Sequence, residues 1–472
     1  MRRLASTLTV LLAIIAACAG ANSASPTQAS PAAPAPTPAG AAARAAGGPS
    51  GPAWTTYHRT ALRAGATSTN IKAPLHHAWT RHLDGAVYGE VLYVEGHLIA
   101  ATENDSVYAL NPSTGQVIWR RHLAKPASES DIRSGSGLSG CGDIFPLGIT
   151  GTPAYDATTG SVFVVAESRG GHHTLWALNA RTGARRWHRS TDVLPGRNRR
   201  AEQQRSALLV THGRVITTYG GLSGDCGNYV GYVTSTATTG TGKTAHYAVP
   251  TPREAGMWSP AGPVTGANGN VYVASGNGAE IGGKWDKSDS VTELNPTTLH
   301  RIAIFAPSVW RSDNRYDRDL GSSSPIPVPA VHRLVVAGKN GHIYLLKPSL
   351  AGIGSSVAST DNCGGGAFGG AARKGRVVVM PCKSGILALR VRRSGLHRLW
   401  SANGIYASPV IAGAHVLAAD LNSDSLKVIS LKRGHVQGSA SLSPLTHFPS
   451  ESTVGHEVYV GTLDGVSALR GS

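Results

Sequence analysis

Residues 107–119 read Val-Tyr-Ala-Leu-Asn-Pro-Ser-Thr-Gly-Gln-Val-Ile-Trp, and residues 175–187 repeat the plan as Leu-Trp-Ala-Leu-Asn-Ala-Arg-Thr-Gly-Ala-Arg-Arg-Trp. Each copy contains an alternating apolar strand, a turn of the form Asn-x-x-Thr-Gly, and a second strand that ends on Trp119 or Trp187. A supersecondary unit that recurs along a chain is typical of proteins that stack one unit many times. The sequence therefore predicts an all-β repeat protein.

The number of repeats predicts an eight-bladed β-propeller, in which each blade is a four-stranded antiparallel sheet. The innermost strands are expected at 87–94, 150–155, 206–211, 259–265, 323–329, 367–372, 407–412 and 447–454. The last unit reaches Ser472 without a fourth strand, so we expect residues 76–83, which contain Trp79, to complete it and close the ring. Seven blades remain the alternative if one of the irregular units, 206–249 or 367–402, is not a blade.

The amino terminus predicts export. A short basic start is followed by a largely apolar stretch of 14 residues, 4–17, which is too short for a membrane span and typical of a signal peptide. The following Cys18 completes a pattern that resembles a bacterial lipobox, so we expect residues 1–17 to be removed and Cys18 to carry a lipid anchor. Residues 18–53, rich in Ala, Pro and Ser, predict a disordered tether before a propeller at 54–472. The alternative is ordinary cleavage further on, which would give a secreted protein.

The formal charge of +17 is spread along the chain. Its densest part, Arg181 to Arg205, contains eight arginines, which would either dock on an anionic envelope surface or form a solvated blade edge and loop. For an exported chain without a known nucleic-acid-binding module, we expect no nucleic-acid partner. We also expect a monomer.

Four cysteines remain once Cys18 is assigned to the anchor. An even number in an exported protein predicts disulfides, with three connectivities open. We expect the pairs Cys141–Cys226 and Cys363–Cys382.

The repeat resembles that of the pyrroloquinoline-quinone (PQQ) type β-propellers, a superfamily that includes quinoprotein dehydrogenases and members that bind no quinone. The resemblance extends to single residues. Trp258 matches the floor beneath the quinone, and Asn277, in a Gly-Asn turn, matches a calcium ligand. Residues 313–319 match the segment with the catalytic Asp, which would be Asp317 or Asp319, and Lys339 matches a basic residue at the quinone carbonyls.

In a dehydrogenase these residues would act together. Trp258 would stack on the planar quinone, and hard oxygen ligands suit calcium. Asp317 or Asp319 would accept the proton of an alcohol while hydride passes to the quinone. The chain departs from this pattern at one ligand, because Asp225 stands where the dehydrogenases have Glu, and it has no Cys-x-x-Cys-His haem motif.

Two functions follow. The first is a non-catalytic scaffold at the outer face of the cell membrane that binds a protein or an envelope polymer. Its binding surface would be the loop-rich face, which the long insertions 124–149, 190–205, 276–288 and 305–322 build. A propeller lipoprotein that assists barrel assembly in outer membranes is a fold-level precedent. The alternative is a PQQ- and calcium-dependent dehydrogenase of an alcohol or sugar, which requires Asp225 to lie beside Asn277.

Overall fold

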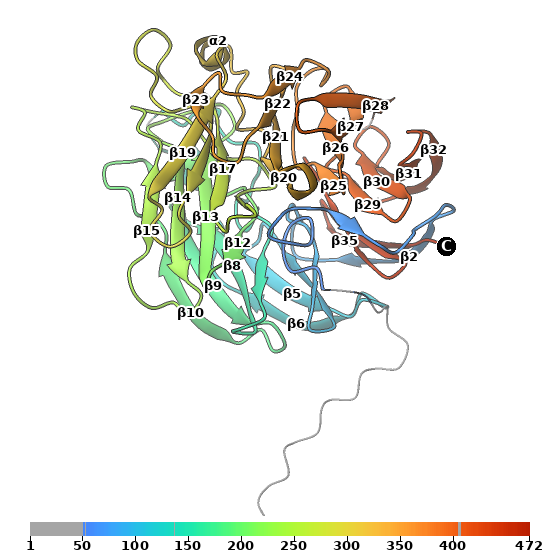
Figure 1. Ribbon diagram of the computed structural model, residues 1–472. Helices are drawn as coiled ribbons and strands as arrows, with labels where there is room; N and C mark the ends of the chain where they lie inside the picture. The colour runs from blue at the N-terminus through green and yellow to red at the C-terminus, as the bar shows by residue number, and fades with distance from the viewer. Residues whose placement is uncertain (1–50, 52, 136, 405–406) are drawn as a thin grey trace, which may run out of the picture. The chain divides into compact units, whose positions relative to one another are not determined.

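The computed structural model describes residues 51, 53–135, 137–404 and 407–472. The predicted signal peptide, Cys18 and the tether up to residue 50 lie outside the described residues. The described part of the chain forms eight antiparallel blades around a central axis, as the sequence predicts (Figure 1).

The first four blades lie between residues 92 and 306. Blade 1 consists of β3 (Leu92–Val94), β4 (His97–Ala101), β5 (Ser106–Leu110) and β6 (Val117–His122). Blade 2 consists of β7 (Ala154–Asp156), β8 (Ser161–Ser168), β9 (His172–Asn179) and β10 (Arg185–Ser190). Blade 3 consists of β12 (Leu209–Thr211), β13 (Arg214–Gly221), β14 (Tyr232–Ala237) and β15 (Ala245–Ala248), with β11 (Glu202–Gln203) added to β13. Blade 4 consists of β16 (Val264–Thr265), β17 (Val271–Ser275), β18 (Ser290–Leu294) and β19 (Arg301–Ala306), with β23 (Gly352–Ile353) added to β19.

The last four blades include both ends of the folded body. Blade 5 consists of β20 (Ile326–Val328), β21 (Arg333–Ala337), β22 (Ile343–Leu346) and β24 (Ala358–Thr360). Blade 6 consists of β25 (Ala372–Lys374), β26 (Val377–Cys382), β27 (Gly385–Val391) and β28 (Leu396–Asn403). Blade 7 consists of β29 (Val410–Ala412), β30 (His415–Asp420), β31 (Ser425–Ser430) and β32 (Val436–Ser441), with β1 (Ala66–Thr67) added to β29. Blade 8 consists of β33 (Glu451–Val454), β34 (Glu457–Thr462), β35 (Gly465–Arg470) and β2 (His76–His82).

Blade 8 confirms the predicted ring closure. The early strand β2 pairs antiparallel with the last strand β35, with Trp79 opposite Ala468. A propeller closed in this way joins its first and last blades and leaves no unpaired seam between them.

Burial along a blade explains the sequence pattern. The middle strands are buried on both sides because each blade packs between two others, so β5 is buried at all five positions. The outermost strands contact a neighbour on one side only, and β6 alternates between exposed and half-buried residues. This accounts for the apolar second and third strands and for the basic outer strands.

Antiparallel order assigns the connections to two faces. The loops between second and third strands, and those between successive blades, leave from one face, which we call the loop face. The long insertions at 124–149, 190–205, 276–288 and 305–322 lie there, with the short helices α1 (Glu129–Arg133) and α2 (Trp310–Arg315). The tight hairpins within blades leave from the other face, the turn face.

Residues 54–67 run across the inner strands, an arrangement that the sequence did not predict. This plug segment forms backbone hydrogen bonds of 2.7–3.1 Å with the inner strands of five blades, at Tyr93, Tyr155, Thr265, Arg373 and Ile411. Trp54 and Tyr57 are buried, and the buried guanidinium of Arg63 donates to the carbonyls of Leu208 and Pro263. The segment therefore spans the middle of the ring. We call the part of the ring between this segment and the loop face the funnel.

Both expected disulfides are present, Cys141–Cys226 and Cys363–Cys382. Cys141 and Cys226 join the loop after blade 1 to the loop between β13 and β14. In the described part of the chain, no helix has the length and apolar character needed to cross a membrane.

Candidate functional site

The structure brings the six residues of the quinone-site hypothesis together at the mouth of the funnel. We call Asp225, Trp258, Asn277, Asp317, Asp319 and Lys339 the funnel cluster. They come from blades 3 to 5, from the loops β13–β14, β15–β16, β17–β18, β19–β20 and β21–β22. Each of these loops leaves from the loop face, which is why residues 114 positions apart in the sequence can meet.

Asp225 lies beside Asn277, with 3.5 Å between the Asn277 amide nitrogen and a carboxylate oxygen of Asp225. The hydroxyl of the buried Tyr229 donates a hydrogen bond to the other carboxylate oxygen. Asp225 has a positive φ of 51°, which turns its side chain away from the strand direction. Two oxygen-bearing side chains are thus adjacent, as the calcium hypothesis requires.

Close backbone contact places Asp319 against the turn that carries Asn277. Asp319 is fully buried, and its carboxylate accepts a hydrogen bond of 2.6 Å from the backbone N–H of Gly321. A Cβ atom at Gly276 would lie 2.9 Å from the same carboxylate oxygen. The Gly-Asn turn therefore needs its glycine because a side chain would push Asp319 away.

Lys339 joins the acidic and aromatic parts of the cluster. Its ammonium contacts the Asp317 carboxylate and lies 3.1 Å from that of Asp319. It also lies 5.3 Å from the centroid of the Trp258 ring, within the range of a cation–π contact.

The charges around Lys339 shift its titration and that of its neighbours. Burial disfavours its charged form, but the carboxylates of Asp319 and Asp317 outweigh that effect and raise the pKa of Lys339. Partial burial raises the pKa of the Asp317 carboxyl to about 6, and Lys339 acts against this shift. Burial, followed by the nearby Asp313 and Asp319, raises the pKa of Asp289 well above its usual range. Lys339 therefore stays protonated and neutralises an otherwise acidic site.

Sequence reasoning missed three residues of the funnel. Phe448, from the connection before blade 8, lies between the rings of Trp258 and Phe368, 6.1 Å from each centroid. The guanidinium carbon of the buried Arg205 lies 4.8 Å from the Phe448 ring. Because these residues come from blades on opposite sides of the axis, no local motif marks them.

Arg205 also corrects one interpretation of the basic run 181–205. Arg181, Arg185, Arg186 and Arg199 are exposed, as a solvated blade edge requires. Arg205 is instead buried in the funnel, because it immediately precedes the inner strand of blade 3.

The funnel cluster meets only part of what a quinone and its cation need. Asp225 and Asn277 are adjacent, but the atom of Asn277 that faces Asp225 is its amide nitrogen, and Lys339 already balances the charge of Asp319. Stacking on Trp258 needs a parallel free face, whereas Lys339 lies over this ring and Phe448 is tilted by 53° to it. In the described residues, no three His, Cys, Asp or Glu side chains cluster as metal ligands. As arranged, the cluster does not offer a planar quinone a free ring face, and only Asp225 and Asn277 match the expected cation ligands.

Comparisons with known proteins agree with the fold. The family model described as outer membrane protein assembly factor BamB matches residues 76–289. No curated protein matches the sequence significantly.

Several solved structures share the fold at low sequence identity. The quinohemoprotein alcohol dehydrogenase of Comamonas testosteroni is 17% identical, with a TM-score of 0.66, over 89% of this chain and 80% of that chain. The quinohemoprotein alcohol dehydrogenase ADHIIG of Pseudomonas putida HK5 is 16% identical, with the same TM-score and coverage. BamB of Moraxella catarrhalis is 16% identical, with a TM-score of 0.57, over 84% of this chain and all of that chain.

The matched relatives thus include dehydrogenases and an assembly factor, and at these identities the likeness concerns the fold. The repeat sequence, the eight blades and the family match agree with one another. The chain therefore has an eight-bladed propeller fold similar to that of the quinohemoprotein alcohol dehydrogenases and BamB.

Proposed function

We propose that this chain is an exported, lipid-anchored propeller that acts as a non-catalytic binding module at the outer face of the cell membrane. Cys18 carries the anchor, and the loop face binds a protein or an envelope polymer. The proposal rests on the contacts of Lys339, because its ammonium group already contacts Asp317, Asp319 and the face of Trp258. The side chains that a dehydrogenase would turn toward its cofactor are here bonded to one another.

Two further features support a binding role for the loop face. The plug segment spans the middle of the ring, so a partner meets a surface that includes the funnel. Around α2 this surface also presents large apolar side chains, among them Tyr316, which is 60% exposed, and Val309, which is 44% exposed. Exposed aromatic and aliphatic residues among arginines are typical anchors of protein interfaces.

Site-directed photo-crosslinking in cells that express the full chain tests the proposal. A photoreactive residue at Tyr316 on the loop face should give a discrete crosslinked species. The same residue at Val436, which is 52% exposed on the outer strand β32 of blade 7, is the matched control and should give none. Equal crosslinking at both positions, or none at either, would contradict a binding role for the loop face.

The second candidate is a PQQ- and calcium-dependent dehydrogenase of an alcohol or sugar. The observation in its favour is the pairing of Asp225 with Asn277. In that role Asp225 and Asn277 would hold the cation and Asp317 or Asp319 would accept a proton, while Lys339 and Phe448 would have to leave the Trp258 ring.

Titration of the protein with PQQ and Ca²⁺, followed by quinone absorbance and Trp fluorescence, separates the two functions. The binding module predicts no saturable signal at micromolar PQQ. Saturable, calcium-dependent binding that is lost in Asn277→Ala and kept in Asn362→Ala, an exposed position in the connection between blades 5 and 6, would establish the dehydrogenase-type site instead.

A further inference from the structure

Tryptophans on outer strands join four pairs of blades by one recurring contact. Each indole N–H donates a hydrogen bond to a backbone carbonyl in a turn of the following blade. The pairs are Trp79 to Pro112 at 3.0 Å, Trp119 to Ala180 at 3.2 Å, Trp187 to Thr238 at 3.1 Å and Trp400 to Leu431 at 2.8 Å. A glycine in the same turn receives the ring, since a Cβ atom at Gly115 would lie 2.5 Å from the Trp79 ring. We call this contact the tryptophan dock.

The register of the strands identifies the residues that replace the dock in blade 4. In blades 1, 2, 6 and 8 the docking Trp lies opposite an Ala of the third strand, in the pairs Trp119–Ala109, Trp187–Ala177, Trp400–Ala388 and Trp79–Ala468. In blade 4 the corresponding pair is Ala303 opposite Glu293. Blade 4 has therefore lost the indole and gained a carboxylate.

The corresponding turn of blade 5, at Pro348, still accepts a hydrogen bond from blade 4. The hydroxyl of Tyr272 donates to the carbonyl of Pro348 at 2.9 Å. Blade 8 has the same contact, because Tyr459 donates to the carbonyl of Pro112 at 3.1 Å, and there Trp79 shares the acceptor. The junction between blades 4 and 5 thus keeps the tyrosine of the dock and lacks its tryptophan.

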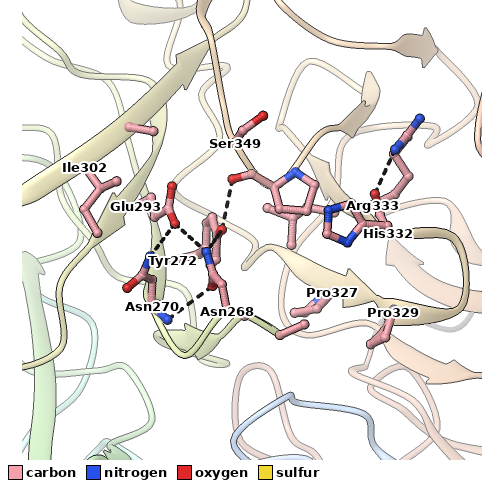
Figure 2. A pocket seen from close by; sticks show the side chains of 15 residues that line it. Asn268, Asn270, Tyr272, Glu293, Ile302, Pro327, Pro329, His332, Arg333 and Ser349 are labelled. Atoms are coloured by element: carbon pink, nitrogen blue, oxygen red, sulfur yellow. Dashed lines mark hydrogen bonds between the residues drawn. The ribbon is translucent and has the colours of Figure 1, made fainter.

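A cavity of about 510 Å³ occupies this junction on the turn face (Figure 2). Its walls are largely apolar and include Ile302, Pro327 and Pro329. One end of the cavity is polar, where Figure 2 shows Asn268, Asn270 and Glu293 joined by hydrogen bonds. Its volume lies within the range of small-molecule sites, about 300–1,000 Å³.

Glu293 is the feature that points to a ligand. Its side chain is 97% buried, and one carboxylate oxygen accepts hydrogen bonds of 2.7 Å from the amides of Asn268 and Asn270. Within the described ranges, no Lys, Arg or His lies within ion-pairing distance of Glu293. Other buried carboxylates of the described residues, such as Glu103 and Glu451, also lack an ion pair, but Glu293 lines this cavity. A carboxylate in such a wall attracts a cation, because burial of its charge is costly unless a positive charge compensates it.

The one cation in the cavity wall does not fill this role. The guanidinium of Arg333 donates instead to the carbonyls of Arg393 and His332. Figure 2 shows Arg333 at the end of the cavity opposite Glu293. The cavity wall therefore presents no cation to Glu293.

We propose that the cavity between blades 4 and 5 binds an arylalkyl ammonium. The flat ring occupies the space of the absent tryptophan, against Tyr272 and the proline walls. The ammonium binds the Glu293 carboxylate. The same chemistry occurs in a free amine and in the amino terminus of a peptide that begins with an aromatic residue. The site lies on the turn face and is independent of the funnel cluster.

Calorimetric titration of the full chain with tryptamine tests the proposal. Tryptamine carries both the ring and the ammonium, whereas tryptophol lacks the ammonium and n-butylamine lacks the ring. We expect one saturable site with an affinity at least tenfold above that of either fragment, because a charge-assisted hydrogen bond to a buried group adds to ring burial. The peptide Trp-Gly-Gly distinguishes the sources: binding equal to tryptamine indicates peptide amino termini, and at least tenfold weaker binding indicates free amines.

Two variants identify the groups responsible. Glu293→Gln should weaken tryptamine binding at least tenfold, and Ala303→Trp should abolish it by restoring the indole. Ile118→Trp, which adds an indole at an exposed position on the outer strand of blade 1, is the control and should leave the affinity unchanged. Thermal melting of each variant separates lost binding from lost folding.

Three results would contradict the proposal. The proposal is wrong if tryptamine does not bind, if tryptophol binds as tightly as tryptamine, or if the folded Ala303→Trp variant still binds. If Ala303→Trp does not fold, Glu293→Gln decides: retained affinity in that variant overturns the role of the carboxylate.

Discussion

The junction between blades 8 and 1 and the junction between blades 4 and 5 have the same strands in the same register but different contents. At the first, Trp79 packs on Gly115 and its indole donates to Pro112. At the second, Ala303 leaves a cavity beside the buried Glu293. Two residue exchanges on facing strands thus separate a filled seam from a cavity. The comparison teaches that this fold can change one junction without altering the blades on either side.

Removing the indole of Trp79 from the junction between blades 8 and 1 should have the largest effect on stability. Trp79→Ala should lower the free energy of unfolding by about 4 kcal/mol, because it deletes a large buried side chain and its hydrogen bond at the closure of the ring. Urea denaturation followed by circular dichroism measures the change. As a control, Ile118→Ala at an exposed position on the outer strand of blade 1 should cost under about 1 kcal/mol. An equally small loss for Trp79→Ala would mean that the docks do not hold the ring together.

A second test uses a buried glutamate that, unlike Glu293, has a cationic partner. Glu167 of blade 2 is 1% exposed and lies 3.1 Å from the ring of the buried His173, which also lies 2.9 Å from Asp192. Burial lowers the pKa of His173, but Glu167 and then Asp192 outweigh it and raise the pKa to about 10. Protonated His173 therefore stabilises the folded state below its unfolded-state pKa, about 6.5.

The sign of that shift fixes the pH profile. The stabilisation from His173 should be complete at pH 6 and should decrease as the pH rises through about 10. His173→Gln should lower the free energy of unfolding by about 3 kcal/mol at pH 6, and less as the pH approaches 10. Urea titrations at pH 6, 8 and 10 measure this difference. A difference that grows with pH would show that His173 is neutral in the folded protein.

The smallest expected effect concerns the turns that receive the indoles. Gly115→Ala should cost about 2 kcal/mol, because φ is 67° and the new Cβ would lie 2.5 Å from Trp79. Gly213 has nearly the same φ, 66°, but its Cβ position is open and no indole docks there, so Gly213→Ala should cost about 1 kcal/mol. Chemical denaturation of both variants checks the pair. Equal losses would show that backbone conformation, and not the indole, selects glycine in these turns.

The repeat unit explains how much of the fold was predictable. Strand alternation, the Asn-x-x-Thr-Gly turn and the terminal Trp are local patterns, so they predicted eight blades, and each predicted inner range overlaps an observed inner strand. Ring closure by residues 76–83 followed from the missing last strand, and the structure confirms it in the pairing of β2 with β35. The plug segment escaped prediction because it makes only one or two backbone hydrogen bonds with each of five separate blades, which leave no periodic pattern.

The funnel cluster was predictable residue by residue but not as a working site. Resemblance located Asp225, Trp258 and Asn277, and antiparallel topology brings them to one face. The contacts of Lys339 with Asp319 and with the Trp258 ring had no sequence signal, and neither did the approach of Phe448. They depend on how loops from different blades pack.

By itself, the sequence determined the repeat, the architecture and the four cysteines that pair, because each follows from local periodicity or from a small number of combinations. Only the tertiary structure decided which side chains meet between and above the repeated blades. It neutralised the acidic funnel with Lys339, placed residues 54–67 across the middle of the ring, and left Glu293 buried without a cation where Ala303 replaces an indole. These contacts depend on distances between blades, which the repeat pattern of the sequence does not specify.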